Sequence, residues 1–232
     1  MVYRLRKFSE FWAGAVKELP ALSMALLDAP IYFLPLFRHL LRLKIPVIAL
    51  SQNIESLAPH QVCHNRALRL LTEDLEIFMR CRLVITVSRE ECFLLSNLGI
   101  RALFVPYYPV QPIQARLLAV REQRRTTAKH GILMVGTTKN LPTRDGMERA
   151  AAYWHEHRLD RDVGKLIIGG YQSETYFDPR PFGDSIDFRG TLTNEQMDSL
   201  LSRVKALLAY QRSGAGVLTR NREMLMAGIP VL

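Results

Sequence analysis

The stretch that decides the fold is GAGVLTRNREMLMAGIPVL, which runs from Gly214 to Leu232. It contains a G-x-G turn after an apolar strand, then a predicted helix, then a second strand. Glycines let backbone N–H groups come close to an anion, and the positive end of a helix dipole attracts it further. Arg220 adds a charge there, and Glu223, one turn into the helix, can accept hydrogen bonds from sugar hydroxyls. The segment therefore predicts an anion-binding turn in an α/β domain, although a plain tight turn would use the same glycines.

The rest of the chain alternates between strand-like and helical segments, which is typical of parallel sheets with helices on both faces. The expected strands are short apolar runs at 46–50, 84–88, 102–106, 132–135, 166–168, 186–189, 204–210 and 229–232. The expected helices cover 65–79, 88–99, 144–157 and 193–204. No strand with a following glycine-rich loop is expected before residue 44, and residues 172–184 are expected to form a loop.

Two of these helices carry a sequence signal at their start. Ser88 with Glu91, and Thr193 with Gln196, have the spacing of a capping box, in which each side chain bonds the backbone of the other residue. Both boxes follow a predicted strand, so they support the alternation of strand and helix.

On these residues the final segment resembles the donor-binding segment of glycosyltransferase family 4. In that family a G-x-G turn is followed by a basic residue and then by E-A-x-x-x-G-x-P-V. The matching positions of this chain are Gly214, Gly216, Arg220, Glu223, Gly228, Pro230 and Val231. In the family, the glycine turn and the basic residue hold the nucleotide diphosphate, and the glutamate binds the ribose. Many members carry an acid eight residues before that glutamate, where this chain has Ala215.

The resemblance continues upstream. Segments similar to the donor domain of the family lie at 132–140, 165–170, 186–190 and 204–210, and segments similar to its acceptor side lie at 44–56, 80–91 and 103–110. One of them matches a loop that often reads H-N-x-E-S, with Gln52 in place of the histidine. The resemblance implies the GT-B architecture, an α/β fold of two Rossmann-like domains with parallel sheets facing a cleft. We expect an acceptor-side domain at 1–112, a linker at 113–130 and a donor-binding domain at 131–232, in a chain truncated at both ends.

The activity that the resemblance implies is transfer of a sugar, with retention, from a nucleotide-sugar donor to a glycan, lipid-linked or polysaccharide acceptor. Backbone dipoles and basic side chains can stabilise the leaving diphosphate in this fold, so we expect no metal and no cofactor. The donor-binding candidates are Gly136, Thr137, Lys139, Gly214, Gly216, Val217, Arg220 and Glu223. The acceptor-side candidates are Asn53 and Glu55, because they follow the carboxyl end of a predicted parallel strand. No catalytic residue is assigned.

Each candidate also has a structural interpretation. Arg220 and Lys139 could be solvated surface charges, and Glu223 could simply favour the dipole of its helix. Asn53 and Glu55 could cap a loop. The register of Glu223 with the A-G-I-P-V tail favours the binding interpretation for the final segment.

The formal net charge of +9 is compatible with nucleic acid, anionic lipid or a phosphorylated substrate as partner. The basic residues are mostly scattered and show no zinc-finger spacing, so we expect no nucleic-acid partner. Residues 1–27 are basic and apolar. They fit peripheral contact with an anionic membrane and an ordinary helix docked on a sheet equally well. No stretch reads as a transmembrane helix, because charges and prolines interrupt the apolar run at 22–41.

The three cysteines, Cys63, Cys81 and Cys92, do not form an even disulfide framework, and we expect no signal peptide. A cytoplasmic location is therefore expected, with peripheral attachment to the inner face of the membrane as an option. Asp160 and Asp162 form a D-x-D in a charged connection, where solvation is favoured over metal binding.

Two rival functions stay open at this point. One is a truncated or non-catalytic relative that binds only the nucleotide, which the alanine at position 215 favours. The other is a basic nucleic-acid-binding module, which only the net charge supports.

Overall fold

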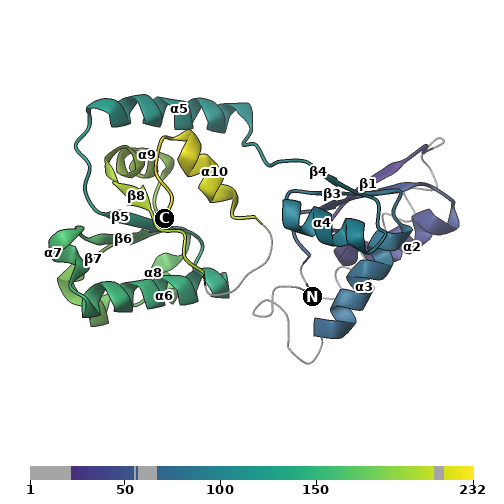
Figure 1. The fold of residues 1–232 in the computed structure, drawn as a ribbon, viewed down its shortest axis with the longest axis horizontal. Helices are drawn as coiled ribbons and strands as arrows, with labels where there is room; N and C mark the ends of the chain where they lie inside the picture. Colours follow the sequence, from purple (N-terminus) through teal and green to yellow (C-terminus); the bar gives the residue numbers. More distant parts are fainter. Residues whose placement is uncertain (1–21, 55, 57–66, 212–216) are drawn as a thin grey trace. The chain divides into compact units, whose positions relative to one another are not determined.

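The computed structural model of the chain describes residues 22–54, 56, 67–211 and 217–232 (Figure 1). The chain divides into two compact units. The first ends at Pro106 and also includes Val217 among the described residues, whereas the second begins at Tyr107 and takes in the C-terminal segment from Leu218. Gly214, Gly216, Ala215 and Glu55 lie outside the described residues.

The first unit contains one parallel sheet in the order β1-β2-β3-β4. Its strands are β1 (Ala25–Asp28), β2 (Val47–Ser51), β3 (Leu83–Thr86) and β4 (Ala102–Phe104). Its helical elements are η1 (Pro30–Phe33), α2 (Leu34–Arg42), α3 (Ala67–Arg80) and α4 (Arg89–Asn97). Apolar side chains from α2, α3 and α4 pack on the strands to form the core, with Phe37, Leu40, Val84 and Leu95 among the fully buried ones.

Strand β1 corrects part of the expectation for the start of the chain, because a strand does precede residue 44, although no glycine-rich loop follows it. Its four residues pair in parallel with β2, with Ala25 opposite Val47 and Asp28 opposite Leu50. It is an edge strand in which partly buried residues alternate with exposed ones, and Leu26 is 58% exposed. The run has only four residues and ends in Asp28, so it lacks the continuous apolar character of a buried parallel strand.

The second unit contains a parallel sheet in the order β7-β6-β5-β8. Its strands are β5 (Ile132–Val135), β6 (Leu166–Gly169), β7 (Ile186–Gly190) and β8 (Ala206–Leu207), and a parallel bridge from Leu207 to Val231 places the final segment beside β8. The chain moves outward from β5 to β7 and then returns to the other side of β5. This reversal creates a topological switch point between β5 and β8, where open α/β sheets bind ligands at the carboxyl ends of their strands.

Helices cover both faces of this sheet, as Figure 1 shows. One face packs against α6 (Leu141–Glu156), through Met147, Ala151 and Trp154. The opposite face packs against three helices, α5 (Gln111–Thr126), α9 (Asn194–Arg203) and α10 (Thr219–Met226). Neighbouring residues of one strand face opposite cores, because Ile132 and Met134 join the first and Leu133 the second.

The connections of the second unit hold more helix than the sequence predicts. Residues 172–184, expected as a loop, contain α8 (Ser173–Tyr176) and the first part of η4 (Arg180–Ser185). A short α7 (Leu159–Asp162) follows α6. The segment 113–130, expected as a linker, lies mostly in α5, whose buried Leu117 and Val120 belong to the core of the second unit.

The two capping signals have different outcomes. The box of Thr193 and Gln196 is confirmed in both directions at the start of α9. At the start of α4 the Ser88 hydroxyl accepts from the Glu91 N–H at 3.2 Å, as expected. The Glu91 carboxylate does not complete that box, because its Oε1 accepts instead from the backbone N–H of Ile54 at 3.0 Å. A buried long-range bond has therefore replaced the local one.

Candidate functional site

The loop after β5 lies at the switch point and is packed backbone to backbone. The Gly136 N–H donates to the Gly169 carbonyl at 3.3 Å, at the end of β6. A Cβ on Gly136 would overlap the Arg220 guanidinium, and a Cβ on Gly170 would overlap the Gly136 carbonyl. The buried Thr138 hydroxyl donates to the Gln172 carbonyl at 2.9 Å and so ties this loop to the one after β6. Only glycine fits at 136 without displacing the arginine.

Arg220 lies in the first turn of α10 and reaches across to the end of β5. Its guanidinium donates to the Val135 carbonyl and, at 3.4 Å, to the Thr143 hydroxyl in the first turn of α6. The crevice that Arg220 lines with these residues is narrow, with a volume of about 10 Å³. Burial lowers the pKa of Arg220. Within the described parts of the chain no carboxylate pairs with it, so this cation is held by neutral oxygens alone.

Two helices begin at this edge of the sheet without a side-chain cap. The residues before them are Asn140 for α6 and Leu218 for α10, and neither side chain accepts a hydrogen bond from the first turn. The Asn140 Oδ1 atom is buried and has no hydrogen-bond partner among the described residues. Lys139 is exposed in the adjoining loop. The N-terminal dipoles of two helices thus add to the charge of Arg220, which makes this edge electropositive.

Glu223 lies inside α10 and is held by a residue that sequence reasoning missed. The Tyr107 hydroxyl donates to Glu223 Oε1 at 2.7 Å, and the Arg222 Nη1 atom donates to the Tyr107 carbonyl at 3.0 Å. Burial first, and then the hydrogen bond and charge of Glu223, raise the pKa of Tyr107 to about 12. The only sequence signal for this contact is the tyrosine pair between prolines that follows β4.

The remaining candidates are less constrained. Thr137 is exposed in the β5 loop, and Val217 is half-buried. In the first unit Asn53 is half-buried after β2, and its carbonyl accepts from the Ser51 hydroxyl at 3.2 Å. The Gln52 amide in the same loop donates to the Asp28 carboxylate at 3.2 and 3.3 Å. The carboxyl ends of β1 and β2 therefore present polar groups side by side.

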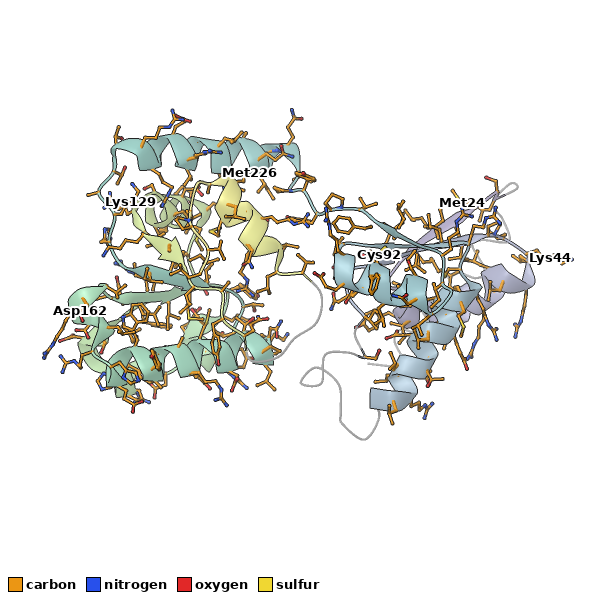
Figure 2. All side chains as sticks on the ribbon, in the orientation of Figure 1. Met24, Lys44, Cys92, Lys129, Asp162 and Met226 are labelled. Atoms are coloured by element: carbon orange, nitrogen blue, oxygen red, sulfur yellow. The ribbon has the colours of Figure 1, made fainter. Side chains whose placement is uncertain are left out.

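No cluster of three or more potential metal ligands occurs in the described ranges. Asp162, labelled in Figure 2, projects from α7, and Asp160 pairs with Arg158 at 3.7 Å. Within those same ranges no helix has the length and apolar character to cross a membrane.

No family model matches the sequence, and no curated protein matches it. Solved structures do match the fold. Sucrose-phosphate synthase from Thermosynechococcus elongatus is 16% identical, with a TM-score of 0.66 over 99% of this chain and 60% of that one. HepE of Anabaena in complex with UDP is 12% identical, with a TM-score of 0.62 over 98% of this chain and 62% of that one. A UGT transferase from Siraitia grosvenorii in complex with UDP is 9% identical, with a TM-score of 0.59 over 100% of this chain and 67% of that one.

These likenesses confirm the expected fold class, with two Rossmann-like units that each contain a parallel sheet, as in the GT-B fold. This chain spans about three fifths of the length of the first two structures.

Proposed function

We propose that the second unit binds the diphosphate of a nucleotide-sugar at the switch point between β5 and β8, and that the protein transfers the sugar. The observation that carries this proposal is Arg220, a partly buried cation with neutral partners at an edge where two uncapped helices begin. Burying a charge without a counter-charge is costly, so an arginine held in this way favours a site whose ligand supplies the anion.

The diphosphate would lie against the first turn of α10 and the loop at 136–139. Arg220 would exchange its bond to the Val135 carbonyl for a charge-assisted bond to a phosphate oxygen. As the bond to the sugar breaks, negative charge grows on the phosphate that leaves, and preorganised N–H dipoles and the guanidinium would stabilise it. This role needs no metal ion. Glu223 would accept hydrogen bonds from the ribose.

Finer features of the proposal rest on the resemblance to family 4. They are retention at the transferred sugar, a glycan, lipid-linked or polysaccharide acceptor, and a cytoplasmic protein in peripheral contact with the membrane. The acceptor would approach the carboxyl ends of β1 and β2, where Asn53 follows the strand and Gln52 is bonded to Asp28. Two of the similar structures contain UDP, which makes UDP the first nucleotide to test.

Calorimetry on the full chain tests the proposal, with UDP, GDP, ADP and CDP as ligands. A hydrogen bond to a charged group contributes about 1.5–3 kcal/mol. Arg220→Ala should therefore weaken binding of the preferred nucleotide about ten- to hundredfold. Arg161→Ala is the matched control, because Arg161 is an exposed arginine on α7, and its affinity should equal that of the wild type.

Two results would overturn the proposal. One is a folded wild-type protein that binds none of the four nucleotides, and the other is equal affinity in the two arginine variants. If the protein binds the nucleotide but neither hydrolyses the matching nucleotide-sugar nor transfers its sugar, it is a nucleotide-binding protein and the proposed transferase activity is wrong.

A further inference from the structure

Tyr107 is gripped from two sides by successive residues of α10. Its phenol hydroxyl donates to Glu223 Oε1 at 2.7 Å, and its carbonyl accepts from Arg222 Nη1 at 3.0 Å. The two ends of this contact are 116 residues apart in the sequence. The side chains of Tyr107 and Glu223 are both partly buried. A carboxylate side chain that would otherwise sample several rotamers is therefore held in one.

The segment that carries Tyr107 is itself well anchored. Pro106 precedes it, and Pro109 follows two residues later and is buried. The Gln114 amide in the first turn of α5 donates to the Pro109 carbonyl at 2.6 Å. Prolines fix the backbone angle φ, so this segment can hold the phenol in place with little freedom of its own.

We infer that Tyr107 is a positioning residue for Glu223. Its hydroxyl occupies one carboxylate oxygen of Glu223, so that the other oxygen is presented to a ribose hydroxyl. Tyr107 thereby sets the preference for ribose over deoxyribose nucleotides. This inference rests on the proposed function, because it names the residue that prepares that same site. A carboxylate has about four acceptor positions on two oxygens, so one bond to a phenol leaves ample capacity for a diol. Tyr107 touches neither phosphate nor sugar in this role.

The test compares a nucleoside diphosphate with its 2′,3′-dideoxy analogue, using the base that binds the wild type best. The measured quantity is the ratio of the two dissociation constants, because only the diol differs between the ligands. In Tyr107→Phe the ring stays and the hydroxyl is lost. We expect affinity for the ribose form to fall about three- to tenfold and affinity for the dideoxy form to stay unchanged. The ratio in Tyr107→Phe should approach that of Glu223→Gln.

Tyr108→Phe is the matched control, because the neighbouring tyrosine is 68% exposed. It should keep the wild-type ratio. If Tyr107 served only to anchor the segment, its variant would weaken both ligands equally and leave the ratio unchanged, which would overturn the inference. The proposed function would survive that result. Failure of the wild type to bind any nucleoside diphosphate would instead remove the proposed function and this inference with it.

A second readout does not depend on a ligand. The protein has eight tyrosines, so the difference in phenolate absorbance between the wild type and Tyr107→Phe isolates the titration of one of them. That titration should have a pKa of about 12, and it should fall when Glu223→Gln removes the nearby charge. An unchanged pKa in Glu223→Gln would show that the two groups are not bonded in solution and would also overturn the inference.

Discussion

Arg124 offers the sharpest test of how the second unit is held together. It is 9% exposed on α5, and its guanidinium donates to three backbone carbonyls. Two lie at the end of α9, those of Leu201 and Val204, the latter at 2.8 Å. The third is the Gly228 carbonyl after α10, at 3.2 Å. One cation thus satisfies the unpaired carbonyls and the negative dipole ends of two helices at once.

Arg124→Met keeps most of the side-chain volume and removes the charge and all the donors. A buried acceptor that loses its partner costs about 1–3 kcal/mol, and water can reach some of these carbonyls after the change. We expect the free energy of unfolding of the second unit to fall by about 2–4 kcal/mol. Arg124→Lys should lose less, because it keeps the charge but cannot reach three carbonyls with one ammonium group.

Fluorescence during urea unfolding can report on this unit alone. The protein has two tryptophans, so a Trp12→Phe background leaves Trp154, which is buried in α6. The control is Arg125→Met. Arg125 is the exposed neighbour and pairs with Glu122 on the helix surface, and its loss should cost about 0.5 kcal/mol or less. Equal unfolding free energies for the Met variants at 124 and 125 would refute the reasoning.

Three further predictions concern single side chains. Gly136→Ala should destabilise the second unit by about 1–3 kcal/mol, because the new methyl group must displace Arg220. Urea unfolding would measure this loss, and an unchanged midpoint of unfolding would contradict the close packing of Gly136 against Arg220. Burial raises the pKa of Asp74, and hydrogen bonds from Ser56 partly offset this rise. The protonated Asp74 therefore stabilises the folded state below the ordinary pKa of 3.8, and this contribution is lost as pH rises through the folded pKa. The melting temperature of Asp74→Asn at neutral pH should therefore be no lower than that of the wild type, and any increase over the wild type should disappear in acid. A lower melting temperature of the variant at neutral pH would count against this prediction. Burial also raises the pKa of Cys81 to about 12. At mildly alkaline pH, Cys81 should therefore be alkylated slowly in the native protein and quickly in the unfolded protein, as measured by peptide mass spectrometry. Equal alkylation rates would show that the Cys81 thiol is not buried.

The strands of the second sheet could be predicted because helices cover both of its faces. A strand buried on both faces reads as a continuous apolar run, as in Ile132–Val135 and Leu166–Gly169, and such runs stand out between polar helices. Edge strand β1 has one exposed side and only four residues, so its alternation is too short to separate from the helix that follows. The sequence of α5 favours a linker because its last two turns are strongly charged. Arg124 within them is buried by tertiary contacts that the sequence pattern does not contain.

The candidate site divides in the same way. Arg220 and Glu223 could be proposed from spacing, because a turn, a basic residue and an acid within one helix form a local pattern. The partners that hold them are distant in sequence. Arg220 bonds Val135, and Glu223 bonds Tyr107, and neither contact leaves a local signal. The roles of Gly214, Gly216 and Glu55 remain predictions, because those residues are outside the described ranges.

The position of α5 has a practical consequence for anyone who wishes to dissect the chain. The sequence suggests that the donor half begins at residue 131. A shortened protein that starts there would expose the apolar side chains of α9 and α10 that pack against α5. It would also leave the last carbonyls of these two helices without the Arg124 guanidinium. Cutting before Tyr107 keeps that helix and also keeps the phenol on Glu223. The boundary at which the two halves should be separated for expression is therefore about two dozen residues earlier than composition alone suggests.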